Sequence, residues 1–105
     1  MAIIAEDEAF LGTEKKYVID IKSQGFDMDT DDFEVVLKRG GNTLTFHKSD
    51  LLKDEEDNWY IAFNTAALGA GTVSITVTAH VPDTDFPDGL RDEVDKFNFL
   101  RIKSV

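Results

Sequence analysis

The stretch from Thr72 to His80 constrains the fold of this chain more than any other part of its sequence. Apolar residues alternate there with threonine, serine and histidine over nine consecutive positions. A period of two puts successive side chains on opposite faces of an extended strand, whereas an amphipathic helix needs a period of about 3.6. Threonine and β-branched apolar residues also favour strands. The stretch therefore predicts a long strand with one buried and one solvated face.

Four further stretches repeat this alternation. They are residues 16–22 (Tyr17, Ile19 and Ile21 inward), 33–38 (Phe33, Val35 and Leu37 inward), 42–47, and 59–64 (Trp59, Ile61 and Phe63 inward). The Gly40-Gly41 pair separates the second stretch from the third, and glycine supplies the positive φ that tight hairpin turns need. We therefore expect residues 33–47 to form a hairpin.

The last strand-like stretch, residues 94–103, changes phase in its middle. Phe97 and Phe99 alternate in one register, and Leu100 and Ile102 in the other. A β-bulge near Phe99-Leu100 would explain the change, and so would a tail whose second half pairs elsewhere.

These stretches predict an all-β chain. Turn signals recur every 8–14 residues, and the only helical signal is one short turn at residues 48–53. The pattern favours an immunoglobulin-like antiparallel β-sandwich of six to seven strands. With 105 residues, the chain has the common size of one domain. We expect residues 13–105 to form it, and residues 1–12 to be a short edge strand, a tail, or an N-terminal arm that packs on a neighbouring subunit.

Composition excludes several function classes. The net charge of −10 would repel the phosphate backbone of nucleic acids, so no nucleic-acid partner is expected. Solubility is the favoured explanation of the acidity, with a basic partner or bound cations as the alternative. The chain has no cysteine, no apolar run of about 18 residues and no secretory signal, so we expect neither disulfides nor a membrane association.

Two acidic loops contain the candidate metal ligands. The candidates are Asp27, Asp29 and Asp31 in the first loop, and Asp83, Asp85 and Asp88 in the second. Alternating carboxylates suit calcium, but an EF-hand would need glycine where Asp32 stands and glutamate where Lys38 stands. Aspartate also favours turns, because its side chain accepts hydrogen bonds from nearby backbone N–H groups. We therefore favour a structural role, and calcium remains the alternative.

No constellation of residues indicates catalysis. His47 and His80 are the only histidines and lack a paired nucleophile, and no glycine-rich phosphate motif precedes a helix. We predict a protein that is not an enzyme and has no cofactor. Trp59 and Tyr60 raise the alternative of carbohydrate binding, since exposed aromatic rings stack on sugars. Trp59 is in phase with the buried residues of its stretch, which leaves Tyr60 as the more exposed ring.

Four segments resemble one protein family. They are residues 25–35 (Gly-Phe-Asp-Met-Asp-Thr-Asp-Asp-Phe-Glu-Val), 46–50 (Phe-His-Lys-Ser-Asp), 59–65 (Trp-Tyr-Ile-Ala-Phe-Asn-Thr) and 81–94 (Val-Pro-Asp-Thr-Asp-Phe-Pro-Asp-Gly-Leu-Arg-Asp-Glu-Val). Together they resemble small structural proteins of tailed phages and prophages of gut bacteria, over roughly residues 16–103. The corner at residues 64–72 also resembles that of bacterial immunoglobulin-like modules, in which Leu68 would plug the end of the sandwich.

The resemblance implies a function without catalytic residues. It implies an immunoglobulin-like virion component of a tail, baseplate or capsid, with other virion or particle proteins as its partners. A homo-oligomer is expected, assembled in the bacterial cytoplasm into a virion or phage-like particle. The alternative function is a carbohydrate- or cell-surface-binding module that calcium would assist.

Overall fold

The computed structural model describes residues 1–105 and confirms that the protein is all-β. Its elements are β1 (Ala2–Ile3), β2 (Asp7–Phe10), β3 (Glu14–Val18), β4 (Asp20–Ile21), β5 (Phe33–Arg39), β6 (Asn42–His47), η1 (Lys48–Asp50), β7 (Leu52–Lys53), β8 (Trp59–Asn64), η2 (Thr65–Ala67), β9 (Gly71–Pro82) and β10 (Leu90–Lys103). The prediction of six to seven strands was too low, because β1, β4 and β7 have two residues each and are too short to show an alternation. Neither three-residue 3₁₀ helix is long or apolar enough to cross a bilayer.

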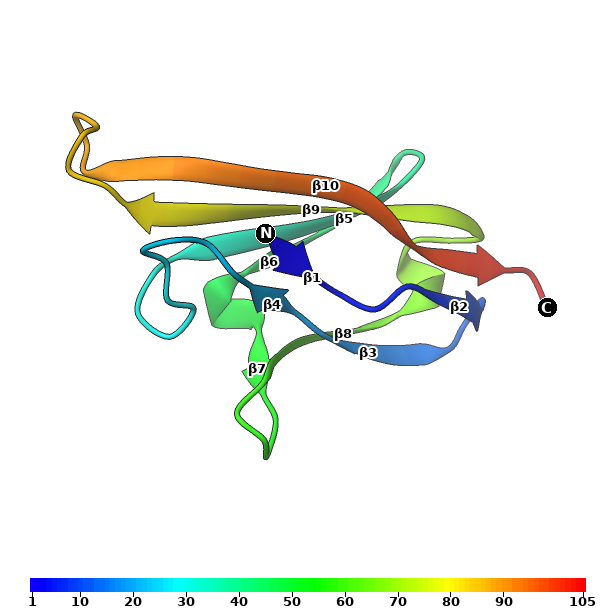
Figure 1. The fold of residues 1–105 in the computed structure, drawn as a ribbon. Coiled ribbons are helices and arrows are strands. Elements are labelled where there is room, and N and C mark those ends of the chain that lie inside the picture. Colours follow the sequence, from blue (N-terminus) through cyan, green and yellow to red (C-terminus); the bar gives the residue numbers. More distant parts are fainter.

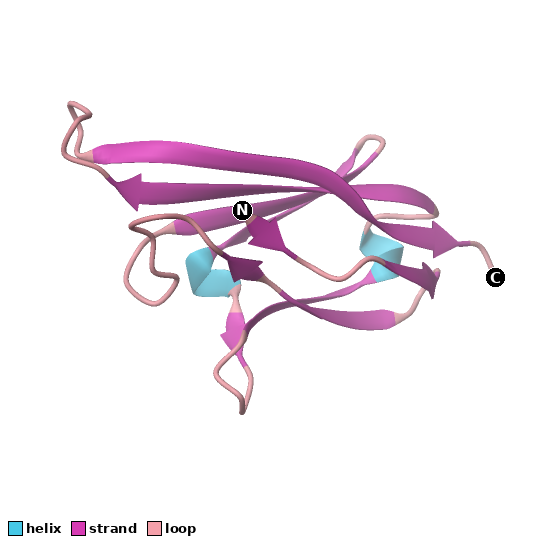
Figure 2. Ribbon diagram, viewed as in Figure 1, coloured by secondary structure: helices cyan, strands magenta, loops and turns pink.

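The strands form two layers that face each other (Figures 1 and 2). One layer is a five-stranded sheet in the order β2-β10-β9-β5-β6, and the other contains the β3-β8-β7 and β1-β4 sheets. Only Ile19 separates β3 from β4, and its N–H donates to the carbonyl of Trp59 at 2.9 Å, so the second layer is nearly continuous. All strand pairs are antiparallel except β2 with β10, which is parallel. The prediction that all strands pair antiparallel is therefore wrong for β2 and β10.

A single apolar core fills the space between the layers. Strand β9 contributes every second residue to it, from Val73 to Val81, while the residues between them face solvent. The inward residues predicted for β5 are buried as well, and so are those of the β3–β4 segment. The predicted alternation is thus confirmed, because each of these strands has one face on the core and one in water.

The predicted turns and the bulge are also present. The β5–β6 hairpin closes with Arg39 opposite Asn42, and Gly40 has a φ of 55° in the two-residue turn. In β10 the register shifts between Asn98 and Leu100, so that Phe99 and Leu100 are both buried. Beyond the shift β10 still pairs with β9, which confirms the β-bulge and excludes the alternative of a tail that pairs elsewhere.

Trp59 does not take the central core position expected of it. It lies half-buried at the margin, where its ring meets Phe33 edge-on with centroids 6.0 Å apart. Its indole N–H donates to Asp29 Oδ1 at 3.1 Å, and the ammonium groups of Lys48 and Lys53 lie 5.7 and 5.0 Å from the ring. An indole N–H needs a polar partner, which holds the ring at the polar edge of the core while Phe33 fills the interior.

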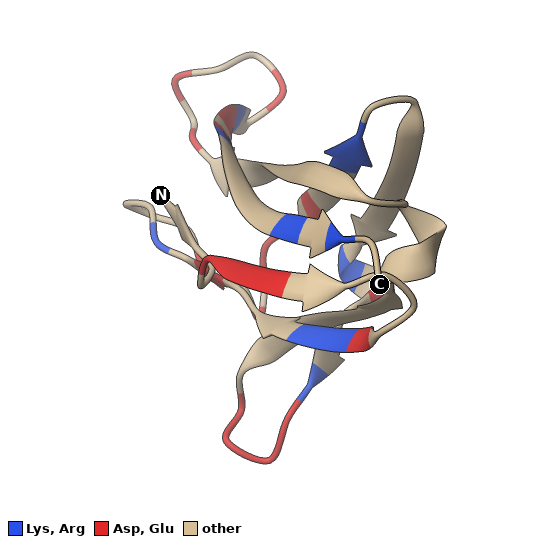
Figure 3. Ribbon diagram, turned by 90° about the vertical axis from the view of Figure 1, so that its right-hand side faces the viewer, with Lys and Arg blue, Asp and Glu red and all other residues tan.

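The first twelve residues pack on their own chain. Strand β1 pairs with β4 in one layer and β2 pairs with β10 in the other, so this segment contributes an edge strand to each. Figure 3 shows the acidic β2 between basic parts of β10 and β3. Asp7 pairs with Lys15 at 3.0 Å and Glu8 with Lys103 at 2.7 Å. The Glu8–Lys103 pair thus supports the parallel pairing of β2 with β10, and the Asp7–Lys15 pair links β2 to β3 in the other layer, although exposed ion pairs contribute little each.

Candidate functional site

The aspartates of the first acidic loop hold the loop together. Asp27 accepts a hydrogen bond from the Asp29 N–H at 2.8 Å, and Asp31 accepts one from the Asp27 N–H at 2.8 Å. The Lys48 ammonium donates to the carbonyl oxygens of Asp29 and Asp31, at 3.0 and 2.9 Å. Two aspartate side chains and one lysine therefore form hydrogen bonds with the backbone of this loop, as the structural interpretation of its aspartates predicts.

Asp29 is the one residue of this loop whose carboxylate faces a cation. Its Oδ1 lies 2.6 Å from the Lys53 ammonium and accepts the indole N–H of Trp59. The hydrogen bond from Lys53, followed by that from Trp59, lowers the pKa of Asp29 below its usual value. The Asp29 carboxylate therefore already has two protein donors, one of which, Lys53, it shares with Asp57 at 2.8 Å.

The second acidic loop is built in the same way. It joins β9 to β10 and begins after Pro82, because β9 continues two residues beyond the Thr72–His80 stretch that predicted this strand. Asp83 accepts a hydrogen bond from the Asp85 N–H at 2.9 Å, and its other oxygen pairs with Arg91 at 2.8 Å. These two bonds, the backbone one being the larger, lower the pKa of Asp83. Asp88 accepts a hydrogen bond from the Leu90 N–H at 3.1 Å.

The six candidate calcium ligands are not gathered into one site. They are Asp27, Asp29, Asp31, Asp83, Asp85 and Asp88. No group of three or more histidine, aspartate or glutamate side chains in this chain has an arrangement that could hold a metal ion. The two histidines are each paired with one carboxylate, His80 with Asp92 at 2.6 Å and His47 with Glu34 at 3.3 Å. Both pairs lie on the solvent-facing side of the five-stranded sheet.

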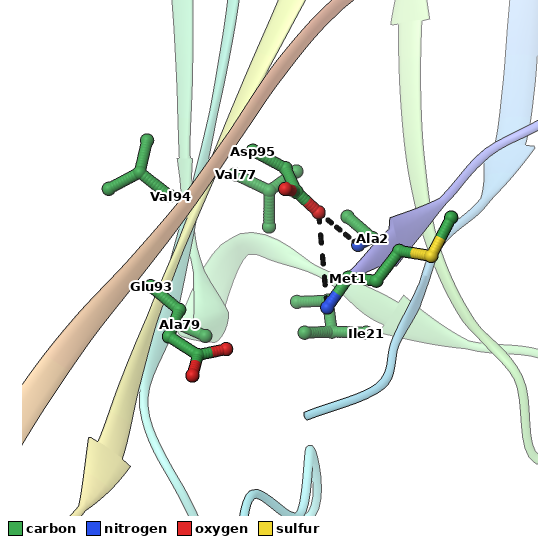
Figure 4. Close-up of a pocket in the computed structure, with 8 residues that line it drawn as sticks. All are labelled: Met1, Ala2, Ile21, Val77, Ala79, Glu93, Val94 and Asp95. Carbon is green, nitrogen blue, oxygen red and sulfur yellow. Dashed lines mark hydrogen bonds and ion pairs between the residues drawn. The ribbon is translucent and has the colours of Figure 1, made fainter. Parts of the chain in front are cut away.

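A cavity of about 280 Å³ opens between β1 and the five-stranded sheet (Figure 4). Ile21, Val77 and Ala79 line it with apolar surface. Asp95 at its rim accepts the N–H of Ala2 at 2.5 Å, so this carboxylate fixes the N-terminal strand rather than facing an empty site. The cavity has no set of free, convergent polar groups of the kind that orients a substrate.

The aromatic pair does not form a platform for sugar stacking. Tyr60 is partly buried, as Trp59 is, and is not a fully exposed ring. The Lys16 ammonium lies 4.1 Å from the centre of the Tyr60 ring and covers one of its faces. A sugar ring could stack on this face only after Lys16 had moved.

The β9–β10 hairpin exposes three large apolar side chains. Figure 1 shows this hairpin projecting beyond the second layer. Phe86 in its turn, with Leu90 and Val94 on β10, keep 46%, 40% and 59% of their surfaces exposed. Figure 4 shows the Val94 side chain directed away from the cavity. We name Phe86, Leu90 and Val94 the hairpin ridge.

The strand edges differ in a way that sequence reasoning did not reveal. Most edge strands carry charged side chains, whereas residues 42–46 of the edge strand β6 carry none. The absence of lysine, glutamate, aspartate and proline in that segment is a signal visible in the sequence, but it has meaning only when β6 is known to be an edge.

Comparison with known proteins shows a likeness of fold and no family. No protein-family model matches the sequence, and no curated protein matches it. Among solved structures, the fold is similar to part of the endo-beta-1,4-mannanase from Thermotoga petrophila, with a TM-score of 0.55 and 11% sequence identity. The match covers 99% of this chain and 20% of that chain, so this protein spans about a fifth of the neighbour's length. At this identity the likeness concerns the fold alone.

Proposed function

We propose that the protein is a non-enzymatic structural or assembly component that acts through protein–protein contacts, within a phage-like particle. The hairpin ridge is the observation that carries this proposal. Soluble proteins seldom leave large apolar side chains grouped on a projecting element unless a partner covers them. Leu90 and Val94 share the outer face of β10, with Phe86 in the adjoining turn, and the ion pair of His80 with Asp92 lies on that face between Leu90 and Val94 as its polar part.

We further propose an immunoglobulin-like type for the sandwich. Counting β3 and β4 as one strand, the layer orders are β1-β3/β4-β8-β7 and β2-β10-β9-β5-β6. This arrangement corresponds to strands A-B-E-D packed on G-F-C, with C′ added beside C. The parallel β2–β10 pair then represents the first strand crossing from one sheet to the other. Domains of this kind commonly attach to something larger, which agrees with an assembly role.

Particle association is the direct test. The tagged chain would be produced in the bacterium that carries the gene, the prophage induced, and the particles banded on a density gradient. We expect the chain to sediment with the particles, and Leu90→Asp with Val94→Asp to abolish this. Val18→Asp, at a valine on β3 that is 42% exposed, is the matched control and should leave association intact. A wild-type chain that stays entirely at the top of the gradient would refute the proposal.

A second candidate, a carbohydrate-binding module that calcium would assist, is favoured by one observation. The structural neighbour is described as an endo-beta-1,4-mannanase, and the fold of this chain matches a fifth of it. A glycan array that includes β-1,4-mannan, read with calcium and with chelator, tests this function. Binding that Lys16→Ala strengthens would support stacking on Tyr60, and silence under both conditions would remove the candidate.

A further inference from the structure

Strand β6 is an edge without the usual protection against pairing with another strand. Exposed edges are normally blocked by charged residues, proline, or very short length. Strand β2, the opposite edge of the same sheet, carries Asp7 and Glu8, and β7 has only two residues. Strand β3 is also rich in charge, and so are residues 91–96 of β10, which pair with β9 on one side and have no partner strand on the other. Residues 42–46 of β6 carry neither a formal charge nor a proline.

The hydrogen bond of His47 identifies which backbone groups of β6 are free. Its N–H donates to Asp50 Oδ2 at 3.0 Å, so this N–H points away from β5. In an antiparallel ladder, the backbone groups of every second residue point to the same side. The N–H and C=O groups of Thr43 and Thr45 therefore point away from β5 as well. No hydrogen bond outside the strand ladders involves the backbone of either residue.

These free groups are arranged symmetrically about Leu44. We propose that two copies of this chain pair antiparallel through β6, with a twofold axis at Leu44, so that their five-stranded sheets join into one. Thr43 of each copy then lies opposite Thr45 of the other, and the two pairs exchange about four N–H···O bonds. A register shifted by two residues would make Thr45 face itself and put Thr43 opposite His47, whose N–H is already taken.

Side chains on both faces of β6 suit this register. Leu44 and Phe46 are half-buried on the core side of the sheet, and Leu44 would contact its own copy across the axis. The threonines lie on the outer face, where Thr–Thr pairs across neighbouring strands are favourable. Because Asp50 caps His47, the open segment is short, and a second copy fills it completely. The geometry of this pairing is argued from β6 alone. Only its biological role rests on the proposed assembly function.

The absence of native cysteine permits a selective cross-linking test. Leu44→Cys places two thiols opposite each other in a non-hydrogen-bonded pair, where Cβ atoms are about 4.5–5.5 Å apart and a disulfide can form after a small adjustment. Phe46→Cys is the matched control, because the twofold puts it opposite Asn42 of the other copy. Under mild oxidation we expect a covalent dimer from Leu44→Cys, formed at least ten times faster than from Phe46→Cys.

Light scattering over a concentration series tests the backbone bonds without a cross-link. We expect the wild-type chain to pass from monomer to dimer, and Thr45→Pro to remain a monomer. Proline is tolerated at an edge position whose N–H faces solvent, so this variant should keep the far-UV spectrum of the wild type. Thr45→Val retains the N–H and should dimerise like the wild type.

Three results would overturn the pairing. The first is a wild-type chain that is monomeric at every concentration and cross-links no faster through Leu44→Cys than through Phe46→Cys. The second is a dimer that persists in Thr45→Pro. The third is a monomeric wild type whose Thr45→Pro variant loses particle association. This result would mean that β6 pairs with a strand of another particle protein and not with a second copy of this chain. Failure of particle association in the wild type, with the dimer intact, would instead refute the proposed function alone.

Discussion

Thr65 is the only polar residue of the chain whose side chain is fully buried, and it provides a sharp test of how the N-terminal segment is attached. Its hydroxyl donates to the Phe10 carbonyl at 3.0 Å and accepts the Thr13 N–H at 3.0 Å. Its own N–H donates to the Thr13 carbonyl at 3.0 Å. One side chain thus joins the β2–β3 turn to the start of η2.

Thr65→Val keeps the shape of the side chain and removes both hydroxyl bonds. Each net hydrogen bond contributes about 1 kcal/mol, and a buried group left without a partner costs more. A 3.3 Å bond from the Thr13 N–H to the Phe10 carbonyl remains and relieves part of that cost, so we expect a loss of about 2 kcal/mol. Thr65→Ser keeps the hydroxyl, loses one methyl group, and should cost about 1 kcal/mol.

Urea unfolding measures both variants. With a slope of about 1–3 kcal/mol/M, the midpoint of Thr65→Val should fall by about 1 M, and that of Thr65→Ser by roughly half as much. Hydrogen exchange should accelerate at the Thr13 amide in Thr65→Val and remain slow in Thr65→Ser. A valine variant as stable as the wild type, or less affected than the serine variant, would refute this account of the corner.

Three further predictions concern the core, the backbone and the carboxylates. Leu68 is completely buried, so Leu68→Ala should cost about 3 kcal/mol in urea unfolding, and a cost below about 1 kcal/mol would contradict its place in the core. Gly71 has a φ of 135°, and an added Cβ would lie 2.8 Å from Cδ of Arg39. Gly71→Ala should therefore lower the free energy of unfolding by about 1–3 kcal/mol. A thermal melt unchanged from that of the wild type would contradict this. The hydrogen bond from Tyr17 lowers the pKa of Asp7, and burial, followed by this hydrogen bond, raises the pKa of Tyr17. The carboxylate therefore contributes stability above about pH 4 that is lost as the pH falls through its lowered folded pKa. Tyr17→Phe should raise the pKa of Asp7 in an NMR titration and make the loss of stability below about pH 4 less steep, whereas an unchanged pKa would contradict this coupling.

Much of the fold is encoded by local alternation. The inward residues of β5 and β9, the Gly40-Gly41 turn and the bulge at Phe99-Leu100 were all predictable, because a strand with one buried face must show a period of two. The structural role of aspartates such as Asp27 and Asp83 was predictable for a similar reason, since Asp caps backbone N–H groups within a few residues of itself.

Other features depend on contacts between distant segments. The parallel pairing of β2 with β10 joins residues about 90 positions apart in the sequence, and no local pattern specifies it. The marginal position of Trp59 likewise follows from Asp29, whose side chain the fold brings to the indole N–H. The hairpin ridge and the β6 edge also depend on such distant contacts, because the exposure of Val94 and of β6 is set only when the sheets are assembled.

The sequence by itself therefore determined the buried faces of most strands and the position of the β5–β6 turn, whereas the lack of catalysis inferred from its motifs stays a prediction. Only the tertiary structure decided which strands are edges, which carboxylates are neutralised by a cation, and which apolar side chains are left uncovered. The physical reason is that alternation and turn chemistry act between near neighbours. Strand order and surface exposure arise from the packing of the whole chain.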